Sequence, residues 1–152
     1  MVQMDETFSI TLKKIAKLVD QNTLNLHLKV CQILKQEIYH YDWVGFYLLK
    51  DGALQLGPFA GKPTEHVTIA IGKGVCGQVA EKKETIIVQD VYQETNYISC
   101  SIDVQSEIVV PILINGEFVA ELDIDSHSPG PFTSNDQVFL EEVCALLANS
   151  FN

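Results

Sequence analysis

The stretch EIVVPILINGEFVAELDID, residues 107–125, decides the fold of this chain. Two apolar runs flank Asn115-Gly116, a pair suited to the two-residue type I′ turn of a β-hairpin. Asp123 and Asp125 lie two positions apart in the second run, so they share one face of a strand. The stretch therefore predicts an antiparallel hairpin that carries acidic side chains on one face.

Outside the hairpin, the spacing of apolar residues predicts the remaining elements. Helices are expected at about 8–20, 24–39, 75–82 and 134–150, and strands at 43–49, 53–59, 67–71 and 85–90. Asn22 or Thr23 is expected to cap the second helix, and Thr133 or Ser134 the last one. This order predicts an α+β fold with a central antiparallel sheet. The two N-terminal helices and the C-terminal helix should cover one face, leaving a ligand pocket under loops on the other.

Length and charge narrow the class of protein. The 152 residues suit a single domain spanning 1–152, with 47% hydrophobic and 20% charged residues. No apolar run reaches the roughly 18 residues of a membrane span, and the acidic N-terminus does not resemble a signal peptide, so we expect a cytoplasmic protein. The net charge of −10 repels nucleic acid and anionic membranes, so neither is an expected partner. Small cationic or zwitterionic ligands remain compatible with it.

The four cysteines fall into two pairs. Cys31 and Cys144 lie in apolar helical segments, where cysteine usually acts as a small core residue. Cys76 and Cys100 lie among glycines and polar residues. In a reducing compartment all four are expected to be free thiols, with any disulfide transient and catalytic.

Cys76 and Cys100 both lie in sequence contexts that suit a reactive thiol. Cys76 follows Gly72-Lys73-Gly74 and should occupy the first turn of a helix, whose macrodipole favours thiolate over thiol. The same glycines also fit a plain strand-to-helix turn. Cys100 lies in a long polar connection, residues 91–106, and connections of that length are usually functional.

Aromatic and acidic residues complete the candidate pocket. In WVGFY, Trp43 and Tyr47 share a strand face with Gly45 between them, which leaves a hollow suited to a methyl or methyl–sulfur group. Both rings would equally suit an ordinary core. Three carboxylates, Glu107, Asp123 and Asp125, would together bind an ammonium group or share a proton. A solvated strand end is the alternative for them.

Together, the segments DWVGFYLL, LQLGPFAGKP, IGKGVCG, SEIVVPI and LDIDS resemble the free methionine-(R)-sulfoxide reductase family, which is built on a GAF domain. The resemblance implies thiol-dependent reduction of free L-methionine-(R)-sulfoxide. It implies that Cys100 attacks sulfur and becomes a sulfenic acid, and that Cys76 or an external thiol resolves it. A thioredoxin-like reductant would complete the cycle, with no other cofactor.

The resemblance also assigns substrate contacts. Trp43 and Tyr47 match the cage around the substrate methyl. Glu107, Asp123 and Asp125 match the carboxylates that hold the free amino acid and assist the sulfoxide. GAF domains often dimerise through their terminal helices, so a homodimer is compatible with this assignment.

The chain departs from the family at positions that keep other functions open. His66 stands where the family has a further cysteine, and Tyr97 and Ser101 replace a histidine and an aspartate beside Cys100. Another small sulfur compound is therefore an alternative substrate. His66, Cys76 and Cys100 would also suit zinc, iron or copper in a metal-dependent redox enzyme or sensor. His66 would alternatively activate Cys100 or lie on the surface, and a non-catalytic binding module is a third class.

Overall fold

The computed structural model describes residues 5–93 and 103–152. Within these residues the chain forms four α-helices and six β-strands in the expected order. Their bounds are α1 Glu6–Asp20, α2 Leu26–Glu37, β1 Trp43–Lys50, β2 Ala53–Ala60, β3 Thr68–Ala70, α3 Gly74–Lys82, β4 Ile86–Val88, β5 Ser106–Ile114, β6 Glu117–Ser126 and α4 Ser134–Leu147. Single 3-10 turns follow β4 and α4 at Val91–Gln93 and Ala148–Phe151.

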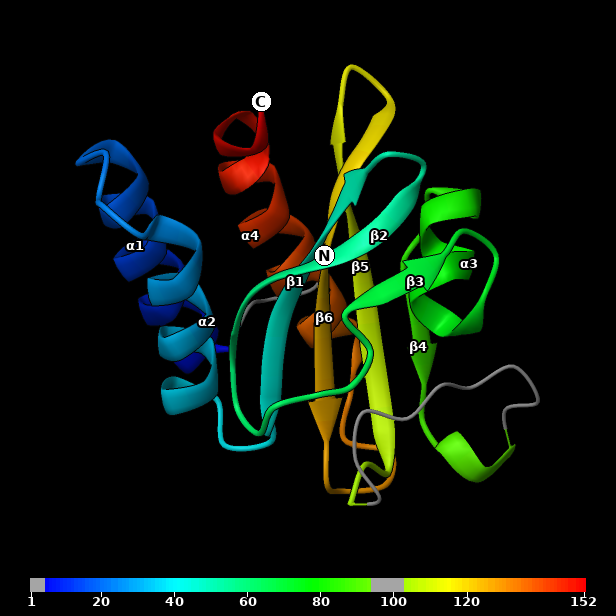
Figure 1. Ribbon diagram of the computed structural model, residues 1–152. Helices are drawn as coiled ribbons and strands as arrows, with labels where there is room; N and C mark the ends of the chain where they lie inside the picture. Colours follow the sequence, from blue (N-terminus) through cyan, green and yellow to red (C-terminus); the bar gives the residue numbers. More distant parts are fainter. Residues whose placement is uncertain (1–4, 94–102) are drawn as a thin grey trace.

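The six strands form one antiparallel sheet in the order β3-β2-β1-β6-β5-β4 (Figure 1). The predicted hairpin supplies two of its inner strands, β5 and β6. Asn115 and Gly116 have φ angles of 52° and 80°, the two positive values that a type I′ turn requires. Pairing sets Glu107 opposite Asp125. The hairpin prediction is therefore confirmed, including its turn.

The three longer helices, α1, α2 and α4, lie on one side of the sheet, as predicted (Figure 1). Their apolar side chains join alternate residues of β1, β5 and β6 in one buried cluster. Phe8 and Phe139 stack there with ring centroids 4.5 Å apart. Thr133 caps α4, and its own N–H donates to the Asp136 carboxylate in a capping box. This face supplies most of the hydrophobic stabilisation of the fold.

Among the described α-helices, only the short helix α3 lies on the opposite face (Figure 1). A second buried cluster forms between α3 and this face and includes Val75, Val79, Val109 and Tyr47. Because only one short α-helix covers it, this face is the side on which the ligand pocket is expected.

The boundaries of two helices differ from the sequence prediction. The second helix begins at Leu26 because Asn22 and Asn25 adopt left-handed backbone angles that interrupt it. Neither Asn22 nor Thr23 is its cap. The first helix begins earlier than expected, at Glu6, because Asp5 accepts the N–H of Thr7 at 2.7 Å. Of the helices described, none has the length and apolarity that crossing a bilayer demands.

Candidate active site

Three predicted acidic residues meet on the open face of the sheet. Glu107 lies on β5, and Asp123 and Asp125 lie on the neighbouring strand β6. Glu107 is 3% exposed, and both aspartates are 0% exposed. The alternative of a solvated strand end is therefore wrong. Burying three carboxyl groups is costly unless each shares a proton or meets a partner.

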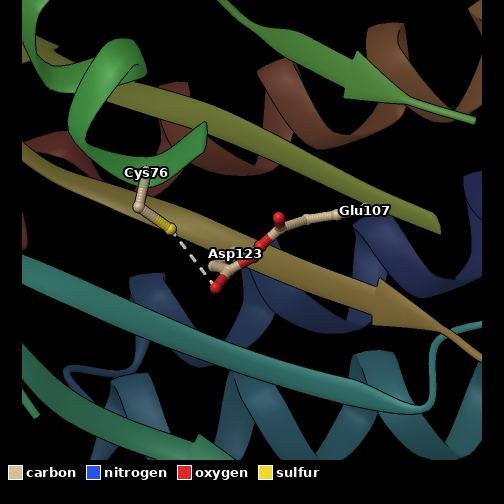
Figure 2. Close-up of side chains that lie close together, drawn as sticks. All are labelled: Cys76, Glu107 and Asp123. Atoms are coloured by element: carbon tan, nitrogen blue, oxygen red, sulfur yellow. Dashed lines mark hydrogen bonds between the residues drawn. The ribbon is translucent and has the colours of Figure 1, made fainter. Parts of the chain in front are cut away.

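Cys76 reaches these carboxyl groups from α3. Its thiol donates to Asp123 Oδ2 at 3.4 Å, and Figure 2 shows the sulfur directed at Asp123 with the Glu107 carboxyl beside it. Gly77 lets α3 pack closely against the end of β3, since an added Cβ would stand 2.5 Å from the carbonyl oxygen of Ala70. The predicted position of Cys76 in the first turn of a helix is confirmed.

The expectation that Cys76 is a thiolate is wrong. Burial raises the pKa of this thiol well above its usual value, and the carboxylates of Asp123, Glu121, Glu107 and Asp125 raise it further. A helix macrodipole contributes only about 0.3–1 kcal/mol at an exposed site. The surrounding negative charge outweighs it, so Cys76 holds its proton at neutral pH.

A fourth buried carboxyl group, Glu121, was missed by the sequence analysis. It lies on β6 two residues before Asp123, so the period of two that united the aspartates would have found it. It is 0% exposed, and neither of its oxygens accepts a hydrogen bond within the described chain. Burial and the Asp123 charge raise its pKa well above the usual value, while the Cys76 thiol opposes them.

Asp123 and Glu107 form a proton-sharing pair. Burial raises the pKa of Asp123, while hydrogen bonds with Glu107 and Cys76 and the charge of His66 oppose the rise. A hydrogen bond between two carboxyl groups requires a proton on one of them. The pair can therefore donate a proton inside the site.

The two predicted cage residues stand at different places on this face. Trp43 pairs with Asp125 across the β1–β6 ladder. Its indole lies over Gly45, where an added Cβ would come within 2.4 Å of the ring, and it stacks on Phe59. The ring itself therefore occupies the hollow expected above Gly45. The Tyr47 hydroxyl donates to the carbonyl oxygen of His66 at 2.8 Å.

Two cavities adjoin these groups. A small one of about 10 Å³ lies among Tyr47, His66, Cys76, Glu107 and Asp123. A second one, of about 330 Å³, is lined by Trp43, Asp125, His127 and Lys62.

Predictions also concern the other three cysteines. Cys100 lies outside the described residues, so its position relative to His66 and Cys76 stays a prediction. Cys31 and Cys144 are buried, as predicted for core residues.

A larger groove lies away from this chemistry. It measures about 950 Å³ and lies beside α2, β2 and the end of α4. Its described lining includes His27 but no carboxylate or thiol. The acidic face is therefore the better candidate site, because buried titratable groups with shifted pKa values beside a cavity mark candidate functional sites.

This arrangement can recognise a small cation and move a proton. Carboxyl groups at Glu107, Asp123 and Asp125 suit an ammonium group, and the shared proton suits a departing oxygen. The Cys76 thiol supplies a group that can be oxidised.

Comparison with known proteins places the chain among GAF domains. The GAF domain family model matches residues 25–151. The free methionine-R-sulfoxide reductase of Escherichia coli (strain K12) is 37% identical over 115 residues, covering 76% of this chain and 69% of the relative. The enzyme of the same name from Saccharomyces cerevisiae is 42% identical over 113 residues, covering 72% and 62%.

A solved structure agrees with these sequence matches. The X-ray structure of free methionine-R-sulfoxide reductase from Neisseria meningitidis, in complex with its substrate, superposes with a TM-score of 0.90. The two proteins are 32% identical, and the match covers 99% of this chain and 93% of the other. The α+β fold expected from the sequence is confirmed as a GAF fold.

Proposed function

This chain is an oxidoreductase of the GAF-domain family of free methionine-R-sulfoxide reductases, and on that premise we propose that it reduces free L-methionine-(R)-sulfoxide to methionine. One observation carries the proposal beyond the family: the carboxyl groups of Glu107, Asp123 and Asp125 are all buried on neighbouring strands, and those of Glu107 and Asp123 lie beside the Cys76 thiol. Such a face suits a free amino acid more than a side chain within a peptide, because only the free amino acid has an ammonium group at its α-carbon.

The three carboxyl groups have different roles in this binding mode. Asp125 borders the 330 Å³ cavity together with Trp43, so it can pair with the ammonium group while the indole contacts the thioether methyl. Asp123 and Glu107 lie deeper, beside the 10 Å³ cavity. Their shared proton is suited to the sulfoxide oxygen. Tyr47 borders the same cavity and completes the apolar wall.

The chemical step requires a nucleophilic thiol, and the family motif assigns it to Cys100. The Cys100 thiolate attacks the sulfoxide sulfur, and a carboxylic acid protonates the oxygen. Methionine leaves when the oxygen is transferred to the Cys100 sulfur. Cysteine is oxidised to a sulfenic acid by two electrons, and the sulfoxide is reduced by two.

A second thiol then restores the enzyme. Cys76 condenses with the sulfenic acid to give a Cys76–Cys100 disulfide and water. A thioredoxin-like dithiol reduces that disulfide by exchange. Burial keeps Cys76 protonated in the resting enzyme, so it does not compete with Cys100 as the nucleophile. An external thiol can replace Cys76 in this step.

Turnover of free L-methionine-(R)-sulfoxide with a thioredoxin system or dithiothreitol tests the proposal. We expect robust turnover that falls to background in Cys100→Ser and is retained in Cys144→Ala, which alters a buried thiol of α4 on the other side of the sheet. A peptide containing methionine sulfoxide should be a poor substrate. Activity retained in Cys100→Ser would contradict the assignment. Binding of methionine sulfoxide without turnover would favour the non-catalytic module.

A further inference from the structure

We propose that Cys76, Glu107 and Asp123 also bind a zinc ion, and that zinc at this site competes with the amino-acid substrate. The binding half of this inference is independent of the proposed function, whereas the competition half rests on it. The sequence-based metal set of His66, Cys76 and Cys100 shares one ligand with this site. Glu107 and Asp123, from the sheet, replace His66 and Cys100 as the other two ligands.

Three potential ligand atoms lie close together. One donor atom from each of the three residues lies within 4.8 Å of the others. Zinc bonds of about 2.0–2.3 Å in a tetrahedron separate ligand atoms by roughly 3.3–3.8 Å. The distance of 3.4 Å from Cys76 Sγ to Asp123 Oδ2 lies in that range. Figure 2 shows all three side chains converging from α3, β5 and β6.

Uncompensated carboxylate oxygens supply a second, independent indication of a cation. Asp123 Oδ1 and both oxygens of Glu121 are buried without a hydrogen-bond partner among the residues described. Glu121 lies two residues before Asp123 on β6, so its side chain is on the same face of that strand. Buried acceptors without partners are costly, and a bound cation would remove that cost.

The donor set selects the kind of metal. Magnesium and calcium prefer oxygen ligands alone, whereas a thiolate with carboxylates suits zinc. The adjoining cavity of about 10 Å³ approaches the space of a single water molecule, so it suits an ion rather than a larger ligand. His66 borders that cavity too, but its ring nitrogens do not belong to the described group of ligand atoms that lie within 4.8 Å of one another. Binding releases the Cys76 proton to solvent.

Competition follows from the shared carboxylates. Zinc held by Glu107 and Asp123 removes the groups that are proposed to hold the substrate and its proton. We therefore expect zinc to raise the apparent KM for methionine sulfoxide and leave kcat unchanged.

Cobalt(II) provides a direct test of binding, because a cobalt–thiolate bond has a charge-transfer absorption in the near ultraviolet. The reduced, chelator-treated protein is titrated with Co²⁺ alone, and Zn²⁺ is then used to displace it. We expect the band to saturate at one equivalent and to disappear in Cys76→Ser. Affinity should fall at least about tenfold in Asp123→Asn and remain unchanged in Cys144→Ala. Circular dichroism establishes that each variant is folded.

Three results would overturn zinc binding here: no thiolate band, a band that survives in Cys76→Ser, or unchanged affinity in Asp123→Asn. Steady-state kinetics with added Zn²⁺ then tests competition. A zinc effect on kcat alone, or none on KM, would reject that half and leave the binding result intact. Should the protein lack reductase turnover, the cobalt titration still decides whether the site exists.

Discussion

Adjacent residues of β6 are equally buried but chemically opposite. Leu122 and Ile124 pack beneath the three longer helices, whereas Glu121, Asp123 and Asp125 face the side that carries α3. All five are 0% exposed. The apolar pair gains free energy on leaving water, while each carboxyl group loses it unless a proton, ligand or ion compensates. One face of the strand therefore stabilises the fold, and the other supports chemistry at a cost in stability.

Partners distinguish the buried carboxyl groups from one another. Asp136, on the helical side, accepts hydrogen bonds from His40 Nε2 at 2.7 Å and the Tyr41 hydroxyl at 2.8 Å. Glu121, on the α3 side, accepts none from the described residues. A carboxylate with such partners should stabilise the protein, and one without them should destabilise it.

Truncating the apolar face should have the largest effect. Leu122→Ala removes a fully buried side chain between the sheet and the helices and should lower the free energy of unfolding by about 2–5 kcal/mol. Urea denaturation measures this change. Turnover per folded molecule should stay near that of the unmodified protein. A loss below about 1 kcal/mol would show that the helical face is not the main source of stability.

Replacing the unpartnered carboxyl group should act in the opposite direction. Glu121→Leu removes a buried polar group of similar size and should raise the free energy of unfolding at pH 7 by about 1–3 kcal/mol. The same denaturation experiment measures it, with Leu122→Ala as the reference. Destabilisation would mean that Glu121 contributes to the fold, and the contrast between the two faces would fail.

The smallest effect on the free energy of unfolding should come from replacing Asp136, the carboxyl group with hydrogen-bond partners, and that effect should depend on pH. Burial tends to raise the pKa of Asp136, but hydrogen bonds from His40, the Thr133 N–H and Tyr41 outweigh it and lower the pKa. Its stabilisation is therefore present above the unfolded pKa of about 3.9 and is lost as pH falls through the lower, folded value.

Asp136→Asn should accordingly cost about 1–2 kcal/mol at pH 7. Denaturation curves between neutral and acidic pH should show the two proteins converging as Asp136 becomes protonated. A difference that stays constant over this range would indicate that Asp136 acts through packing rather than charge.

The alternation of side chains along a strand predicted most of the contrast between the two faces of β6. A period of two correctly placed Asp123 and Asp125 on one face, and Asn115-Gly116 correctly fixed the turn that brings Glu107 beside them. The GAF-like resemblance predicted the fold. These features depend on residues that are close together in the chain or in one hairpin, so they can be predicted from a single sequence.

The remaining features depend on contacts between distant segments. The raised pKa of Cys76 arises from burial and from carboxylates some 30 to 50 residues further along the chain, so its helix alone suggested the wrong protonation state. Trp43 fills the space above Gly45 because Phe59 of the neighbouring strand stacks on it. The start of α2 depends on left-handed angles at Asn22 and Asn25, which local composition does not dictate. The roles assigned to Cys100 stay predictions.

The central claim is that the acidic face of β6 performs chemistry rather than stabilising the fold. Parallel measurement of kcat/KM for free L-methionine-(R)-sulfoxide and of the free energy of unfolding in Asp123→Asn tests it most directly. We predict a loss in kcat/KM of about 100-fold, equivalent to about 2.7 kcal/mol, with stability unchanged or increased. Retained activity, or a loss of activity that merely follows unfolding, would contradict the claim.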